Sequence, residues 1–159
     1  MFNKIHGNLS SKNLKIGIVV SKFNFIITEK LLSGAIDCFL RNDGEEKNLT
    51  VAFCPGALEI APTSKKLKAN LKLDAIVCLG CVVKGETLHF DYVASESAKA
   101  VSNLANEENA IPVIYGILTT ETMEQAFDRC GGKNGNKGYD AMQSAIEMVN
   151  LFSSISRKK

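Results

Sequence analysis

The sequence predicts an α/β protein, in which helices cover both faces of a parallel β-sheet within a single domain. Short apolar runs alternate four times with segments of helical periodicity, which is the pattern of consecutive βα units. The apolar runs are nearly continuous, as expected for strands that are buried on both faces. A chain of 159 residues with 45% hydrophobic and 23% charged residues is also large enough to bury one core. These observations favour a three-layer α/β/α sandwich.

The first βα unit follows a polar N-terminal extension, residues 1–13, of a domain that we expect to span residues 1–159. Residues 14–20, LKIGIVV, are mostly apolar and are predicted to be a strand. Residues 25–40 have the spacing of an amphipathic helix. The expected apolar side of this helix consists of Ile26, Ile27, Leu31, Ala35 and Phe39.

The second unit begins after a polar, glycine-containing connection at 41–48. Residues 49–54, LTVAFC, are the second predicted strand, and the Pro-Gly pair at 55–56 ends it. Proline is tolerated in the first turn of a helix, where no partner for its missing N–H is needed. Pro62 is therefore compatible with a helix that runs to about Asn70.

The third unit has the clearest pattern. Residues 75–83, AIVCLGCVV, are predicted to be a buried strand, and residues 84–87, KGET, end it abruptly. An amphipathic helix follows from His89 onward and presents one apolar stripe. The stripe consists of Phe90, Val93, Ala94, Ser97, Ala98, Val101, Leu104 and Ala105.

The fourth unit contains a predicted strand at 111–118, IPVIYGIL, and residues 119–121, TTE, can start the next helix. The glycine-rich segment 131–138, GGKNGNKG, is predicted to be a hinge before a last helix and a polar tail at 154–159. The fourth helix is expected to bury Met123, Ala126, Phe127 and Cys130. The last helix is expected to bury Tyr139, Met142, Ala145, Ile146, Val149 and Phe152.

Consecutive βα units with right-handed crossovers give a parallel sheet with helices on both faces. We expect the strand order 2-1-3-4 and a flavodoxin-like arrangement. Ligands of such sheets bind beyond the carboxyl ends of the strands, which meet at one edge. The residues that directly follow each predicted strand are therefore the first candidates for function.

Charge and composition exclude several classes of function. The net charge of +2 is small and dispersed, and the only basic cluster is the three-residue tail 157–159, so we expect no nucleic-acid partner. Residues 1–13 lack the apolar core of a signal peptide, and no apolar run approaches the roughly 20 residues of a membrane span. We therefore expect a cytoplasmic protein without a membrane partner.

The five cysteines are expected to be free thiols, because their number is odd and the chain has no secretory features. Cys78 and Cys81 have the C-x-x-C spacing of zinc and redox centres. Residues three apart in a strand point to opposite faces, so these two sulfurs should share neither a metal nor a disulfide. We expect no metal site.

Residues of several chemical types follow the predicted strands. Phe23 could stack on a planar ring or close the core, and Glu59 could bind hydroxyl groups or simply favour its helix start. The turn at Gly85, Glu86 and Thr87 could hold an anion through backbone N–H groups, or serve only as a helix cap. His89, two residues after Thr87, could transfer protons. The alternative is a histidine on the helix surface without a catalytic role.

Basic residues near the fourth helix are a second candidate group. Arg129, Lys133 and Lys137 could neutralise a phosphate, although cations are also stabilised at helix ends without function. Within one chain they should face away from the strand ends or toward a neighbour. The signatures of dinucleotide-binding and nucleoside-triphosphate-binding loops are absent from the sequence. The residues alone indicate a small phosphorylated or polyhydroxylated ligand.

Several motifs together resemble the 6,7-dimethyl-8-ribityllumazine synthase family over roughly residues 14–150. The motifs are FN at 23–24, PGALE at 55–59, GCVVKGETLHFDYV at 80–93, PVIYG at 112–116, EQAFDR at 124–129 and GNKG at 135–138. The resemblance implies a transferase of riboflavin biosynthesis that needs no metal or organic cofactor. Its substrates would be 5-amino-6-(D-ribitylamino)uracil and 3,4-dihydroxy-2-butanone 4-phosphate.

The resemblance also implies a role for each matching residue. His89 would transfer protons, and the phosphate would bind Gly85, Glu86, Thr87 and Arg129. The ribitylaminouracil would contact Phe23, Asn24, Ala57, Leu58, Glu59, Cys81, Val82, Val83, Tyr115 and Lys137. Tyr115, Leu58 and Lys84 stand where the family commonly has phenylalanine, phenylalanine and arginine, and could shift affinity.

The same resemblance implies a homo-oligomer. Tyr115 and Arg129 would reach the active site of the adjacent subunit of a pentamer, and the length of the segment 129–138 favours an icosahedral capsid of pentamers. Riboflavin synthase is a possible partner. Two alternatives remain: a related riboflavin synthase, and a non-catalytic shell protein that binds lumazine or flavin.

Overall fold

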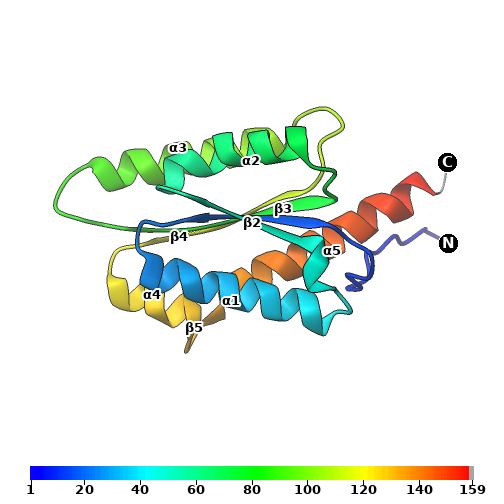
Figure 1. Cartoon of the computed structure of the whole chain (residues 1–159), viewed down its shortest axis with the longest axis horizontal. Helices are drawn as coiled ribbons and strands as arrows, with labels where there is room; N and C mark the ends of the chain where they lie inside the picture. Colours follow the sequence, from blue (N-terminus) through cyan, green and yellow to red (C-terminus); the bar gives the residue numbers. More distant parts are fainter. Residues whose placement is uncertain (158–159) are drawn as a thin grey trace.

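Four parallel strands form the central sheet of the computed structural model, which describes residues 1–157. The strands are β1 (Ile16–Ser21), β2 (Leu49–Cys54), β3 (Ala75–Val83) and β4 (Val113–Thr120). Their order, β2-β1-β3-β4, is the predicted one, and all three pairings are parallel. β2 and β4 are therefore the edge strands, and the carboxyl ends of all four strands lie at one edge of the sheet (Figure 1).

Helices cover both faces of this sheet (Figure 1), which confirms the three-layer sandwich. One face carries α2 (Ile60–Asn70) and α3 (His89–Ala105). The other face carries α1 (Phe25–Arg41), α4 (Met123–Arg129) and α5 (Lys137–Ser156). Short elements complete the chain: the 3₁₀ helices η1 (Glu46–Asn48) and η2 (Ala57–Glu59), and the strands β5 (Cys130–Gly132) and β6 (Gly135–Asn136).

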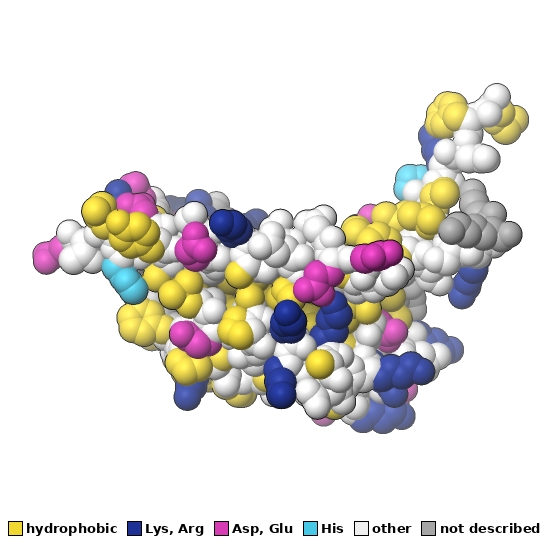
Figure 2. Space-filling view, turned by 90° about the horizontal axis from the view of Figure 1, so that it is seen from above, with side chains coloured by type: hydrophobic (Ala, Val, Ile, Leu, Met, Phe, Trp, Pro, Cys, Tyr) yellow, Lys and Arg dark blue, Asp and Glu magenta, His cyan; other side chains and the backbone are white. Residues whose placement is uncertain are grey.

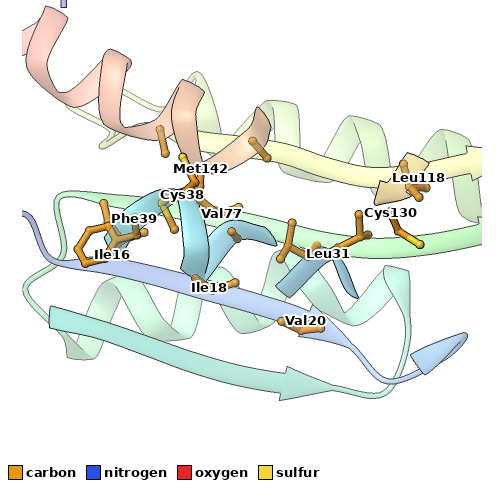
Figure 3. Close-up of a cluster of buried hydrophobic side chains, with 14 of the residues drawn as sticks. Ile16, Ile18, Val20, Leu31, Cys38, Phe39, Val77, Leu118, Cys130 and Met142 are labelled. Atoms are coloured by element: carbon orange, nitrogen blue, oxygen red, sulfur yellow. The ribbon is translucent and has the colours of Figure 1, made fainter. Parts of the chain in front are cut away.

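Two hydrophobic clusters form the core, one on each side of the sheet. The cluster under α1 and α5 contains the fully buried side chains of Leu31, Phe39 and Met142, which pack against β1 and β3 (Figure 3). The other cluster lies under α2 and α3. Cys81 belongs to the first cluster and Cys78 to the second, so the two sulfurs lie on opposite faces as predicted.

All five cysteines are free and buried. Burial raises the pKa of the Cys38 and Cys78 thiols to about 11, and that of Cys81 to about 12. The neutral thiol is favoured because a thiolate would have to leave water. These side chains therefore act as small apolar core residues.

α5 approaches α1 very closely at its start. A Cβ atom at Gly138 would overlap the carbonyl oxygen of Leu31 and lie 2.6 Å from the carbonyl carbon of the same residue. Since these are backbone atoms, no side-chain rotation could relieve the overlap. Glycine at 138 is thus required for the contact between the two helices.

The fourth strand differs from the prediction. β4 begins at Val113 rather than Ile111, because Pro112 has no N–H for a strand ladder; its carbonyl accepts from the Ile76 N–H at 2.9 Å. The strand continues to Thr120, so residues 119–120 belong to it and do not start a helix. α4 is instead capped at Thr122, whose side chain accepts from the Gln125 N–H at 3.2 Å.

The glycine-rich segment 131–138, which was predicted to be a hinge, contains regular secondary structure. It forms the antiparallel pair β5–β6 and the first turn of α5. Asn136 fixes this hairpin, because its side-chain amide donates to the carbonyl oxygens of Lys30 at 2.9 Å and Cys130 at 3.2 Å. Its side-chain oxygen caps α5 by accepting from the Gly138 N–H at 2.9 Å.

Four apolar residues that were expected to be buried are exposed instead: Ile26, Met123, Phe127 and Phe152. They lie in the first turn of α1, on the short α4 and near the end of α5. Periodicity identified the helix faces but not how far the buried core extends along them.

The N-terminus and the last turn of α5 lie at the end of the molecule opposite the carboxyl ends of the strands (Figure 1). Residues 1–10 have no regular secondary structure, and the Asn150 side chain of α5 holds them by donating to the carbonyl oxygens of Asn8 and Ser10, both at 2.9 Å. Residues 154–156 were expected in a polar tail but form the last turn of α5. The expectation for Lys158 and Lys159 lies outside the described residues.

Candidate functional site

A pocket of about 450 Å³ lies at the carboxyl ends of β1, β2 and β3. We call it the strand-end pocket. Its walls come from the β1–α1 turn, the segment between β2 and α2, the end of β3 and the start of α3. The lining residues are Phe23, Pro55, Gly56, Ala57, Leu58, Glu59, Cys81, Val82, Val83, Gly85, Thr87, His89, Phe90 and Val93.

Phe23 and Leu58 are the exposed large apolar side chains that line this pocket. Their exposed fractions are 70% and 46%. The ring of Phe23 is therefore free to stack on a planar ligand. Asn24 does not line the pocket itself, but its side-chain amide donates to the carbonyl oxygen of Cys81 at 3.0 Å.

The segment between β2 and α2 forms a tight 3₁₀ turn that brings Glu59 to the pocket. The Glu59 N–H donates to the carbonyl oxygen of Gly56 at 3.2 Å, and Glu59 directly precedes the first residue of α2. Burial, and then the nearby Glu59 carboxylate, raise the pKa of the Cys54 thiol behind this turn. The pocket thus has one carboxylate at a helix start, where its negative charge is favoured.

The turn between β3 and α3 presents open backbone. α3 begins at His89, and the residue before it provides no side-chain cap. The His89 N–H lies 3.4 Å from the Thr87 hydroxyl oxygen, and nothing lies within 4 Å of a Cβ position at Gly85. Amides at a helix start point out of the helix at its positive end, and together with the free space beside Gly85 they are suited to bind an anion. The imidazole of His89 lies at the same pocket.

Lys84 also marks this turn. Its ammonium lies 3.7 Å from the carboxylate of Glu121, and its backbone N–H donates to the carbonyl oxygen of Thr120 at 2.9 Å. Both ion-pair partners are exposed, so the pair contributes little free energy. It nevertheless links the end of β3 to the end of β4.

A second cavity of about 440 Å³ runs along the free edge of β4, beside α4 and α5. We call it the β4-edge groove. Tyr115, Arg129 and Lys137 line this groove, together with Asp140 and Ser144. Arg129 donates one hydrogen bond to the carbonyl oxygen of Gln125 at 3.0 Å, and Lys137 pairs with Asp140 at 3.0 Å. Burial raises the pKa of the Tyr115 phenol.

The candidate residues therefore fall into two groups. Ten of them line the strand-end pocket: Phe23, Ala57, Leu58, Glu59, Cys81, Val82, Val83, Gly85, Thr87 and His89. Asn24 and Glu86 adjoin the lining. Tyr115, Arg129 and Lys137 lie instead in the β4-edge groove. Within one chain the basic residues do not face the histidine, in agreement with the expected placement of Arg129.

Sequence reasoning missed four residues of the strand-end pocket. Pro55 and Gly56 were interpreted as a turn, and Phe90 and Val93 as part of the buried stripe of α3. Phe90 and Val93 directly follow His89 on the first turns of α3, so their nearness to the candidate histidine was a usable signal. In the groove, Asp140 and Ser144 lie one and two turns after Lys137 on α5.

Acidic and basic side chains are interspersed on the face shown in Figure 2, with hydrophobic side chains between them. Over residues 1–157, no cluster of three or more His, Cys, Asp or Glu side chains could hold a metal ion. No helix of that part of the chain is both long and apolar enough to cross a membrane.

Comparison with known proteins identifies the group to which these motifs belong. The family model of 6,7-dimethyl-8-ribityllumazine synthase matches residues 13–153. Proteins named 6,7-dimethyl-8-ribityllumazine synthase from two strains of Clostridium kluyveri are each 51% identical over 146 residues, covering 92% of this chain and 94% of the relative. The chain belongs to the 6,7-dimethyl-8-ribityllumazine synthase family.

Proposed function

We propose that this chain condenses 5-amino-6-(D-ribitylamino)uracil with 3,4-dihydroxy-2-butanone 4-phosphate to give 6,7-dimethyl-8-ribityllumazine, phosphate and water, the penultimate step of riboflavin biosynthesis. Its family and its relatives support this assignment. The observation that carries it is the composition of the strand-end pocket. An exposed aromatic side chain, a carboxylate, the backbone of a helix start and a histidine meet there.

The apolar part of the strand-end pocket would hold the pyrimidine. Phe23 would stack on the ring, and the backbone of Cys81, Val82 and Val83 would bind its polar edge. Ala57, Leu58 and Glu59 would hold the ribityl chain, since the carboxylate of Glu59 can accept hydrogen bonds from its hydroxyl groups. Asn24 would support this site from beside it.

The phosphorylated ketone would lie at the start of α3. Gly85, Glu86 and Thr87 would bind its phosphate, mainly through backbone N–H groups at the positive end of the helix dipole. This places the carbonyl carbon of the ketone near the amine of the uracil. His89 at the same pocket would transfer protons as the phosphate leaves.

Arg129 would complete the phosphate site from a neighbouring subunit. Arg129, Tyr115 and Lys137 line the β4-edge groove, which is separate from the strand-end pocket of the same chain. A second copy that docks along β4 would bring the two half-sites together. We propose a homopentamer with shared active sites, assembled into an icosahedral capsid in the cytoplasm, with riboflavin synthase as a candidate partner because it uses the product.

Catalysis would rest mainly on positioning. The amine attacks the ketone and forms an imine with loss of water, phosphate leaves, and the second nitrogen closes the ring with loss of water. Orientation of two reactants can contribute about 7–11 kcal/mol, whereas one proton-transfer group contributes about 10²- to 10⁴-fold in rate. We therefore assign the larger part of the rate enhancement to the pocket walls and the smaller part to His89.

The direct test is incubation of the purified chain with both substrates, with lumazine absorbance and released phosphate measured in parallel. Equal amounts of the two products are expected. Lumazine binding without turnover would indicate a shell protein, and conversion of lumazine to riboflavin would indicate a riboflavin synthase.

Two substitutions assign the roles within the active site. His89→Ala should lower kcat by about 10²- to 10⁴-fold and leave residual turnover, because positioning is retained. Arg129→Ala should instead raise the KM of the phosphorylated ketone. Lys133→Ala is a matched control, because Lys133 is an exposed cation that pairs with Asp128 outside the groove. Complete inactivity of a folded His89→Ala chain, or an unchanged KM in Arg129→Ala, would contradict these roles.

A further inference from the structure

The β1–α1 turn, residues 21–24, is hydrogen-bonded to the ends of two other strands. The Lys22 N–H donates to the carbonyl oxygen of Cys54 at 2.8 Å, and the Phe23 N–H donates to that of Pro55 at 3.0 Å. The Asn24 side chain donates to the carbonyl oxygen of Cys81 at 3.0 Å. The turn that follows β1 is thus fastened to the ends of β2 and β3.

The position of Phe23 depends on these hydrogen bonds. Its ring is 70% exposed, so packing of the side chain contributes little to holding it over the pocket. The next residue, Asn24, has a left-handed backbone with φ 56° and ψ 44°, a conformation that costs free energy for residues other than glycine. The direction of the ring is therefore set by hydrogen bonds to the backbone of the turn.

Thr28 supplies a side-chain hydrogen bond to this turn from inside the core. It lies in the first turns of α1, is fully buried and does not line the pocket. Its hydroxyl donates to the carbonyl oxygen of Ser21 at 2.8 Å, and its N–H bonds to the carbonyl oxygen of Asn24 at 3.2 Å. Thr28 thus closes the loop between the end of β1 and the start of α1.

We propose that Thr28 is a positioning residue for the ribitylaminouracil half of the site, acting through the β1–α1 turn on Phe23. This inference rests on the proposed function. Loss of the Thr28 hydroxyl leaves the Ser21 carbonyl without that bond and loosens the turn. The phosphate turn belongs to another segment, after β3, so binding of the phosphorylated ketone is not affected.

The test compares Thr28→Val with Ser64→Ala. Ser64 is the matched control, because its fully buried hydroxyl also donates to a carbonyl oxygen, that of Ile60, at 2.8 Å, but within α2. Both variants should lose stability. Only Thr28→Val should raise the KM of the ribitylaminouracil, by about fivefold to tenfold as expected for one lost hydrogen bond, with the KM of the ketone unchanged.

Two further variants isolate the hydroxyl group. Thr28→Ser and Thr28→Ala both lack the methyl group, and only the serine retains the donor. Serine should restore the wild-type KM and alanine should not, and fluorescence titration with the lumazine product should show the same order of affinity without turnover. These pairs are compared at equal temperature below the Tm of each variant.

Several results would overturn the proposal. An unchanged KM in Thr28→Val, an equal rise for both substrates, or an equal rise in Ser64→Ala would reduce Thr28 to a stability role. Misfolding of both hydroxyl-free variants would assign the hydroxyl to folding and would overturn it as well. The wild-type chain could also prove to be inactive but able to bind lumazine. If Thr28→Val then weakens this binding, the proposed reaction is disproved and the role of Thr28 remains intact.

Discussion

Mixing two defective chains should restore activity if each active site is built from two subunits. His89 lies in the strand-end pocket and Arg129 in the β4-edge groove of the same chain. A chain with His89→Ala retains an intact groove, and a chain with Arg129→Ala retains an intact pocket. Where the pocket of an Arg129→Ala chain meets the groove of a His89→Ala chain, the shared site contains both His89 and Arg129.

The size of the recovery follows from the geometry. In a ring, each interface joins one pocket to one groove, and random assembly from equal amounts gives about one intact interface in four. At ketone concentrations where each variant alone is nearly inactive, the mixture should reach about a quarter of wild-type activity. Activity plotted against the mixing ratio should be a parabola with its maximum at equal amounts.

The assay requires that the two chains are refolded together or co-expressed, with different affinity tags to prove mixed assembly. Lys133→Ala in place of Arg129→Ala is the control, because Lys133 lies outside the groove. In that control, activity should rise linearly with the share of Lys133→Ala chains. A straight line in the main experiment, despite proven mixing, would mean that His89 and Arg129 act within one chain or that Arg129 has no role.

Three predictions concern stability. Ser21→Ala should raise the free energy of unfolding measured by chemical denaturation. The buried Ser21 hydroxyl has no hydrogen-bond partner among the described residues, and such a group costs about 1–3 kcal/mol. Ser64→Ala removes a hydrogen-bonded hydroxyl and should lower the free energy of unfolding. Gly138→Ala should destabilise the fold by about 2–3 kcal/mol, because the added Cβ would overlap the Leu31 backbone. The Tm should fall by about 4–12 °C. An unchanged Tm would show that α5 can shift freely. Burial raises the pKa of Cys81 from 9.0 to about 12, so the neutral thiol contributes stability that is complete below about pH 9 and is lost as the pH rises toward 12. The free energy of unfolding, measured at several alkaline pH values, should show this decline. Its slope against pH should be smaller in Cys81→Ala than in the wild type, by up to about 1.4 kcal/mol per pH unit. Equal slopes would mean that a group other than Cys81 titrates.

The sheet could be predicted from the sequence because its information is local. Each buried strand is a continuous apolar run, and the crossover rule then limits the possible topologies. The opposite facing of Cys78 and Cys81 followed from the two-residue period of a strand alone. Strand ends were less certain, since Ile111 is as apolar as the residues of β4 but precedes a proline that cannot join the ladder.

Features that depend on distant residues could not be predicted in this way. The segment 131–138 was predicted to be a hinge, and its regular structure comes from the bonds of Asn136 to Lys30 and Cys130 and from the contact of Gly138 with α1. Lys137 is a second example, because α4 and α5 place it beside Arg129 in the β4-edge groove and not in the strand-end pocket. The edge position of β4, in contrast, followed from the predicted strand order.

The position of the termini has a practical consequence. The N-terminal segment is held against α5 by Asn150, and this segment and the last turn of α5 lie opposite the strand-end pocket (Figure 1). A fluorophore, an affinity handle or a fused cargo domain attached at either end would extend away from Phe23 and His89. The chain can therefore be immobilised on a sensor surface by either end, with the pocket side of each chain facing the solution.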